Sequence, residues 1–326
     1  MKKILGGMAL TLAMASLYPV FAAEPVATPI VIKAKNSALF DLTRFDGKLV
    51  AVGERGLVMQ STDEGKTWSG ALTPTNRSLN SVLYLGDKIG LAGGHGGTLM
   101  RTADDGATWT QIKSADIGTD SILGLTALSD GRVLAYGSFG MYLESADKGK
   151  TWVRRKIIRD DFERHISKVA EIAPGKLLLV GETGTLASSS DMGATWKELE
   201  SPYAATGADG VKGSLFGVLR LNDGSVMIYG MRGHAYRSTD GAATWTLIPV
   251  TATNTFNGAT VAADGKIVLA GNNGMIATSV DNGQSLALQY IKDGRPLGQA
   301  LVAKDGAIIY VGYLSTGRIE ASAQKP

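Results

Sequence analysis

The sequence predicts an all-β protein, a seven-bladed β-propeller of four-stranded antiparallel blades. Three observations lead to this prediction. An eight-residue turn motif recurs at nearly constant spacing, a glycine-rich hairpin turn precedes each copy, and strand-forming segments remain at both chain ends. Repeats of about 40–50 residues are typical of propellers, in which one repeat forms one four-stranded blade.

The turn motif, which we call the Asp-box, reads Ser/Thr-x-Asp-x-Gly-x-Thr-Trp in its clearest copies. Its six copies occupy residues 61–68, 102–109, 145–152, 189–196, 238–245 and 279–286. Each of the first five copies ends in a tryptophan, and these five are all the tryptophans of the chain, spaced 41 to 49 residues apart. Asp and Ser side chains accept bonds from backbone N–H groups in tight turns, and Gly permits a positive φ. We therefore predict structural hairpin turns, each followed by a tryptophan buried between neighbouring blades.

The second repeated element, which we call the Gly-turn, precedes each Asp-box. It consists of two glycines that bracket two variable residues, at 53–56, 94–97, 137–140, 181–184, 230–233 and 271–274. Paired glycines between apolar segments are a β-hairpin signal. One unit is therefore strand a, polar turn, strand b, Gly-turn, strand c, Asp-box and strand d.

Six units are complete, and they cover residues 38–71, 79–113, 121–157, 165–200, 214–249 and 255–291. A seventh unit, from Pro296 to about Ala321, has three strands and no Asp-box. The segment Pro29–Lys33 can supply its missing outer strand, which would close the ring and leave few exposed edges. An open solenoid is the alternative, but the spare N-terminal strand is what a closed ring requires.

The N-terminal segment predicts export. Lys2 and Lys3 precede an apolar run that ends near Tyr18, and small residues follow at Ala22 and Ala23. This is the layout of a secretory signal peptide, so we expect a signal peptide at 1–23 and a single propeller domain at 24–326. The run is short for a membrane anchor, and the chain has no cysteine for lipid attachment. We expect a periplasmic or otherwise exported, soluble monomer with no direct membrane insertion.

Charge and motifs argue against several classes of function. The chain has 33 basic and 30 acidic residues, whereas a nucleic-acid partner would favour a basic stripe. The three histidines lie in different units without metal-ligand spacing. We expect no nucleic acid, metal, cofactor or catalytic residue.

The pairing of Asp-boxes with Gly-turns resembles the photosystem II stability and assembly factor family, and the segment from Leu79 to Lys113 is similar to a typical repeat of that family. The resemblance covers nearly the whole chain after the leader. It implies a seven-bladed, non-enzymatic propeller that binds membrane proteins or their luminal or periplasmic segments during assembly. Some bacterial relatives are encoded beside efflux-type transporters, which makes an accessory role for such a transporter a related expectation. The chain departs from the photosynthetic branch in lacking a lipoprotein cysteine.

Asp-boxes also occur in sialidases and other glycoside hydrolases, so a carbohydrate-active protein is the alternative function. Such enzymes use two carboxyl groups, or a tyrosine nucleophile in sialidases. Sialidases also have an arginine-led motif and three arginines that hold the substrate carboxylate. The early segment around Arg44 lacks that motif, and no arginines stand in matching positions of three separated blades.

In a propeller, Gly-turns and the connectors between blades share one face, while Asp-boxes and the a–b turns share the other. Variable side chains on a rigid repeated scaffold are typical positions for binding specificity. The longer connectors, 156–165 and 201–213, fall on the Gly-turn face as well. We therefore predict partner-binding residues at Arg55, His95, Phe139, Arg159, Arg164 and Arg232. A solvated, charge-guarded rim is the alternative interpretation of the arginines.

Overall fold

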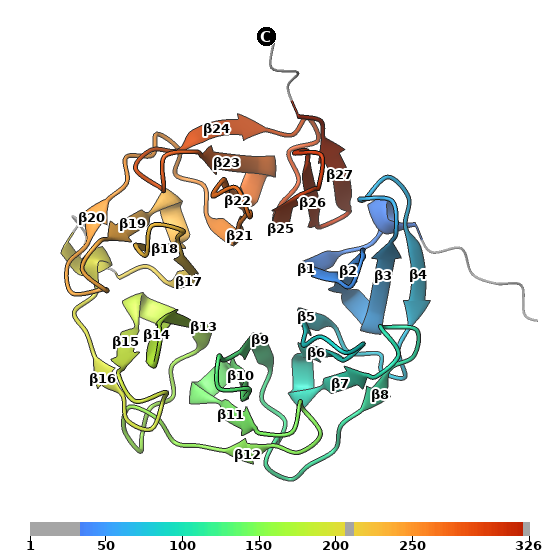
Figure 1. Cartoon of the computed structure of the whole chain (residues 1–326), viewed down its shortest axis with the longest axis horizontal. Coiled ribbons are helices and arrows are strands. Elements are labelled where there is room, and N and C mark those ends of the chain that lie inside the picture. Colours follow the sequence, from blue (N-terminus) through green and yellow to red (C-terminus); the bar gives the residue numbers. More distant parts are fainter. Residues whose placement is uncertain (1–32, 206–211, 322–326) are drawn as a thin grey trace, which may run out of the picture. The chain divides into compact units, whose positions relative to one another are not determined.

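The computed structural model describes residues 33–205 and 212–321, and these residues form seven small sheets arranged as a ring (Figure 1). Each of the first six sheets has four antiparallel strands in sequential order, and the described part of the seventh has three. The predicted seven-bladed propeller is confirmed. The signal peptide and all of the Pro29–Lys33 strand except Lys33 lie outside the described residues and stay predictions.

The strands of the first four blades follow one another from the inner to the outer edge. Blade 1 consists of β1 (Leu39–Phe45), β2 (Lys48–Gly53), β3 (Leu57–Ser61) and β4 (Ser69–Leu72). Blade 2 consists of β5 (Leu79–Tyr84), β6 (Gly90–Gly94), β7 (Leu99–Thr102) and β8 (Thr110–Gln111). Blade 3 consists of β9 (Ile122–Ala127), β10 (Val133–Gly137), β11 (Tyr142–Ser145) and β12 (Val153–Arg154). Blade 4 consists of β13 (Ile166–Ala173), β14 (Lys176–Gly181), β15 (Leu186–Ser189) and β16 (Lys197–Glu198).

The last three blades repeat the pattern. Blade 5 consists of β17 (Leu215–Arg220), β18 (Val226–Gly230), β19 (Ala235–Ser238) and β20 (Thr246–Leu247). Blade 6 consists of β21 (Phe256–Val261), β22 (Ile267–Gly271), β23 (Met275–Ser279) and β24 (Ala287–Tyr290). Blade 7 consists of β25 (Leu297–Val302), β26 (Ile308–Gly312) and β27 (Ser315–Ile319).

Short 3-10 helices make up the remaining regular structure of the described residues. Six are the Gly-turns: η2 (Glu54–Gly56), η3 (His95–Gly97), η4 (Ser138–Gly140), η5 (Glu182–Gly184), η7 (Met231–Gly233) and η8 (Asn272–Gly274). The other two are η1 (Ala34–Asn36), before blade 1, and η6 (Pro202–Ala205), in a long connector. In the described part of the chain no helix is long and apolar enough to cross a membrane.

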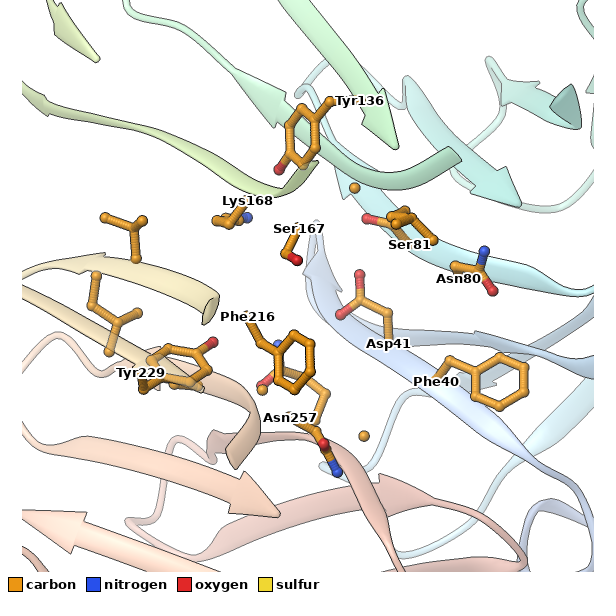
Figure 2. Close-up of a pocket in the computed structure, with 18 of the residues that line it drawn as sticks. Phe40, Asp41, Asn80, Ser81, Tyr136, Ser167, Lys168, Phe216, Tyr229 and Asn257 are labelled. Atoms are coloured by element: carbon orange, nitrogen blue, oxygen red, sulfur yellow. The ribbon is translucent and has the colours of Figure 1, made fainter. Parts of the chain in front are cut away.

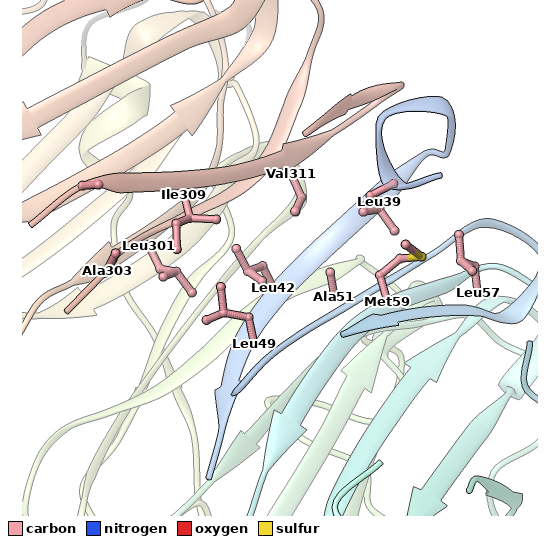
Figure 3. Close-up of a cluster of buried hydrophobic side chains, with 12 residues drawn as sticks. Leu39, Leu42, Leu49, Ala51, Leu57, Met59, Leu301, Ala303, Ile309 and Val311 are labelled. Carbon is pink, nitrogen blue, oxygen red and sulfur yellow. The ribbon is translucent and has the colours of Figure 1, made fainter. Parts of the chain in front are cut away.

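The core is distributed between blades because each sheet buries both of its faces against its neighbours. Figure 3 shows the cluster where blades 7 and 1 meet: Leu42, Leu49 and Met59 of blade 1 pack with Leu301 and Ile309 of blade 7. The two ends of the described chain are therefore joined by the same apolar packing that joins consecutive blades. This burial closes the ring.

Hydrogen bonds between blades also run around the ring. In each of six blade pairs, a long polar side chain of one blade donates to a backbone carbonyl in the Asp-box of the next. The pairs are Gln60 to Gly106, Arg101 to Lys148, Arg132 to Met192, Lys176 to Gly241, Arg237 to Asn282 and Arg318 to Glu64. The last of these joins blade 7 to blade 1.

The tryptophans of the Asp-boxes are not equally buried. Trp109 and Trp152 are buried, as predicted, at 8% and 3% exposure. Trp68, Trp196 and Trp245 are only half-buried. The expectation of burial is wrong for these three, because they pack only against the edges of the core clusters between blades, whereas Trp109 and Trp152 are members of such clusters.

Candidate partner-binding face

Backbone hydrogen bonds identify which turns lie on each face of the propeller. On one face the Gly-turns hold the connectors, as where the Gly97 N–H donates to the Asp120 carbonyl and the Gly140 N–H to the Arg164 carbonyl. On the other face the Asp-boxes meet the a–b turns, as where the Asp105 N–H donates to the Lys88 carbonyl. The predicted division of turns between the two faces is therefore present.

The second variable residue of each Gly-turn has a left-handed backbone. Its φ is 53° in Arg55, 54° in Phe139, 51° in Thr183, 56° in Arg232, 60° in Asn273 and 63° in Gly96. All six residues are exposed. A side chain in this region costs about 1–2 kcal/mol relative to the usual conformation, yet only blade 2 has glycine there. Five blades thus present a side chain to solvent at a position where glycine would be less strained.

The first variable residue has a different role in blades 1 and 4, where its side chain supports the segment that leads into strand a. Glu54 Oε1 accepts a hydrogen bond of 2.9 Å from the Ala38 N–H, and Glu182 Oε2 accepts one of 3.1 Å from the His165 N–H. His95 also occupies a first position, where its Nδ1 lies 3.2 Å from Ser121 Oγ, although its side chain is exposed. The two variable positions look alike in the sequence, and the structure distinguishes them.

Phe139, Arg164 and His165 are brought together by the structure. The Phe139 ring is 61% exposed and makes an edge-on contact with the His165 ring, with centroids 5.2 Å apart. The Gly140 N–H donates to the Arg164 carbonyl at 3.0 Å, and Arg164 Nη1 donates to Thr185 Oγ1 at 3.4 Å. This cluster, at the Gly-turn of blade 3, combines an apolar ring with a cation.

Arg159 is already engaged within the chain. Its Nη1 donates to Glu198 Oε2 at 2.7 Å, its Nε lies 3.2 Å from Asp161 Oδ1, and its guanidinium stands over the Phe162 ring at 5.5 Å. The hydrogen bond with Glu198 raises the pKa of Arg159 above its usual value. A partner carboxylate would have to displace these internal anions, so the contacts favour Arg164 over Arg159 as a binding residue.

The other predicted residues are spread around the ring. Arg55, His95 and Arg232 belong to the Gly-turns of blades 1, 2 and 5. They share a face with the Phe139 cluster without forming one compact site with it. The predicted binding residues are therefore spread over a broad face.

Sequence analysis missed one arginine position that the structure places on this face. Arg77 lies beside the Gly-turn of blade 2, where a Cβ built on Gly96 would be 3.7 Å from Arg77 Nε. Arg77, Arg164 and Arg295 each stand two residues before the first residue of strand a in their blades. Aligning the seven units on strand a would have revealed this shared position, whereas connector length pointed to Arg159 and Arg164.

The central channel contains a cavity of about 370 Å³, which no sequence motif indicated (Figure 2). Asp41 and Lys168 contribute charged groups to it, and Tyr136 and Tyr229 contribute hydroxyl groups. Burial raises the pKa of Asp41, although the carboxylate accepts hydrogen bonds from the N–H groups of Val82 and Leu42. Among the described residues, no group of three or more His, Cys, Asp and Glu side chains could hold a metal ion.

Comparison with known structures gives the same fold at low identity. A structure titled "YCF48 bound to D1 peptide" is 18% identical, with a TM-score of 0.70 over 91% of this chain and 100% of that one. YCF48 from Cyanidioschyzon merolae is 15% identical, with a TM-score of 0.67 over 89% of this chain and 98% of that one. A streptogramin B lyase, an enzyme, reaches 0.73 at 12% identity, over 89% of this chain and 95% of that one. The fold alone thus does not decide function.

Family assignment comes from the sequence pattern of the repeats. The chain has no match among curated protein sequences. The family model described as photosynthesis system II assembly factor YCF48 matches residues 116–295, which is more than half of the chain and spans the Gly-turns of blades 3 to 6. The resemblance carried by the Asp-boxes and Gly-turns is confirmed, and the chain belongs to the family of the photosystem II assembly factor YCF48.

Proposed function

We propose that this chain is an exported, non-enzymatic propeller that binds a segment of another protein on its Gly-turn face. By holding that segment it would assist the assembly or stability of a membrane complex. Family membership supports an assembly role, and the structure of YCF48 with a D1 peptide shows that one protein with this fold holds a peptide.

The observation that carries the proposal is the difference between the two positions of the Gly-turn. In blades 1 and 4 the first side chain holds the segment that leads into strand a, whereas the second residue is exposed in all six copies despite its left-handed backbone. The Asp-box turns also hold left-handed residues other than glycine, but only Lys148 of those six is exposed, so exposure distinguishes the Gly-turn face. Because such side chains recur on five blades, they lie around one face and could contact an extended segment.

The side chains on this face define the chemistry of the partner. Arg55, Arg164 and Arg232 offer guanidinium groups that can bind carboxylates through two parallel hydrogen bonds. Phe139 offers an exposed ring of the kind that anchors interfaces. We therefore expect a segment with several carboxylates and at least one apolar side chain, presented by a membrane protein on the side to which this chain is exported.

A comparative pull-down tests the proposal. The tagged mature chain and the variant Arg55→Glu/Arg164→Glu/Arg232→Glu would each be expressed in the native organism, and co-purifying proteins would be identified by mass spectrometry. We expect a membrane protein with the parent and its loss with the variant. Photosystem II subunits would identify a photosynthetic role, and transporter subunits would identify an accessory role in efflux.

The matched control is Lys66→Glu/Lys150→Glu, which reverses two exposed charges in the Asp-boxes of the opposite face. Exposed substitutions change stability by only about 0.5 kcal/mol, so both variants should fold. If the partner protein is obtained, reversal on the Gly-turn face should mainly slow association, most strongly at low salt. Equal capture by both variants would show that the face is assigned wrongly.

A further inference from the structure

The central channel carries an arrangement of charges that the proposed function does not use. At the third residue of the inner strand, the seven blades contribute Asp41, Ser81, Gly124, Lys168, Gly217, Gly258 and Gln299. Each follows the residue at which the pairing of strands a and b shifts register. Such bulges commonly redirect a side chain. The anion comes from blade 1 and the cation from blade 4, on opposite sides of the ring (Figure 2).

Two tyrosines flank Lys168 from the neighbouring blades. Tyr136 and Tyr229 project from strands b of blades 3 and 5, over glycines of their own inner strands. A Cβ on Gly124 would lie 2.8 Å from the Tyr136 hydroxyl oxygen, and one on Gly217 would lie 2.1 Å from that of Tyr229. The glycines thus make room for the hydroxyl groups. A hydrogen bond of 2.9 Å between the Tyr136 hydroxyl and Thr126 Oγ1 helps to fix this side of the channel.

The anion on the opposite side is held equally firmly. Asp41 Oδ1 accepts from the Leu42 N–H at 2.8 Å and Oδ2 accepts from the Val82 N–H at 2.9 Å. Each oxygen retains acceptor capacity for another donor. Asp41 and Lys168 attract each other through space, but no hydrogen bond joins them in the described structure. A cavity into which a few fixed polar groups converge is a candidate binding site.

Phe40 and Phe216 add an apolar element to the cavity wall. They occupy the second position of the inner strands in blades 1 and 5, and Phe40 remains 37% exposed. The remaining charged residue of the lining, Arg220, is exposed at the end of β17. The cavity of about 370 Å³ is within the range of small-molecule sites, which begins at about 300 Å³.

We propose that this channel binds a free α-amino acid with an apolar side chain. Lys168, supported by Tyr136, would bind the carboxylate, Asp41 would bind the ammonium group, and the side chain would contact Phe40 and Phe216. A free α-amino acid carries both charges on one carbon and can therefore pair with both groups. The site does not depend on the Gly-turn arginines, so this proposal and the protein-binding proposal can fail separately.

Isothermal titration of the purified mature chain with leucine, phenylalanine, glycine and glutamate tests the proposal. We expect leucine and phenylalanine to bind more tightly than the other two. N-acetyl-leucine lacks the ammonium group and leucine amide lacks the carboxylate, and each should bind about ten- to hundredfold more weakly than leucine, as expected for loss of one hydrogen bond to a charged group.

Variants connect the binding to the two residues. Lys168→Met should weaken leucine binding about ten- to hundredfold, and Asp41→Asn should do the same while leaving the affinity for N-acetyl-leucine unchanged. Lys150→Met, on the exposed Asp-box face, is the matched lysine control and should bind leucine like the parent. Circular dichroism and thermal melting establish that each variant is folded. Absence of binding by all four amino acids to the folded parent overturns the proposal, as does equal binding of leucine and its blocked derivatives.

Discussion

The Asp-boxes and the Gly-turns are hairpin turns with closely similar backbones. In blade 3, Phe139 and Gly140 of the Gly-turn have φ values of 54° and 67°, and Lys148 and Gly149 of the Asp-box have values of 57° and 79°. Blade 4 shows the same pair of left-handed residues in Thr183 and Gly184 and again in Met192 and Gly193. The two faces of the propeller therefore differ little in how the chain turns.

They differ in where the side chains make their hydrogen bonds. In every Asp-box the Ser or Thr hydroxyl accepts from the turn N–H and donates to the Asp, and the Asp accepts from both the N–H and the hydroxyl of the following Thr or Ser. Box 2 shows this between Thr102, Asp104, Gly106 and Thr108. The Asp-box side chains make their hydrogen bonds within the turn, which explains why the copies are nearly identical. The second side chain of the Gly-turn follows no such repeated pattern: Phe139 contacts the His165 ring, whereas Thr183 donates to the Glu182 carbonyl.

The largest difference should follow from truncation of a box tryptophan. Trp152 is 3% exposed, packs with Leu91 and Leu143, and donates from Nε1 to the Gly149 carbonyl at 3.1 Å. Trp152→Ala should lower the free energy of unfolding by about 3–5 kcal/mol, as measured by urea denaturation. Trp245→Ala, at a half-buried site, should cost less. Equal losses would show that burial of the tryptophan does not set its contribution.

Acid should selectively weaken the Asp-box face. Hydrogen bonds from the Thr108 hydroxyl and N–H lower the pKa of Asp104 to about 2, and the pKa values of Asp63, Asp147, Asp191 and Asp281 are also about 2. The folded values lie below the unfolded value of about 3.9. The stabilisation is therefore fully present above about pH 4 and is lost as the pH falls towards 2.

Urea denaturation between pH 5 and pH 2 measures this loss. The variant Asp104→Asn/Asp191→Asn has two fewer titrating box carboxylates, so its free energy of unfolding should depend less steeply on pH below 4. An unchanged slope in this variant would mean that the hydrogen-bonded aspartates are not responsible for acid sensitivity.

The smallest effect on stability is expected at the second position of the Gly-turn. Phe139→Gly removes an exposed ring and relieves a left-handed side chain, so the free energy of unfolding should change by less than about 1 kcal/mol. Partner capture should nevertheless fall. Lys148→Gly is the matched control, because its φ is similar and it is also exposed. It should leave partner capture unchanged, and loss of capture in this control alone would reverse the assignment of faces.

Much of this architecture could be predicted from the sequence because the repeat is encoded locally. The Asp-box needs Ser, Asp, Gly and Thr within eight residues, so its turn is visible in the sequence without knowledge of any distant contact. The Gly-turn is visible for the same reason. The number of blades, the order of the strands and the division of turns between two faces follow from these two signals and their spacing.

The sites depend on contacts that local sequence does not encode. Arg159 pairs with Glu198 only because the outer strand of blade 4 lies beside the connector that contains Arg159. Glu54 accepts a hydrogen bond from the Ala38 N–H, while Arg55 is exposed, because the Gly-turn lies close to the start of strand a.

The sequence by itself determined a ring of repeated hairpins and the face on which variable residues would lie, because turn chemistry acts within a few residues. Only the tertiary structure decided which of those side chains remain available and which charges meet in the channel. Asp41 of blade 1 and Lys168 of blade 4 have two blades between them in the chain and face one cavity only when the ring closes. Ring closure is a property of packing between blades, which no single repeat contains.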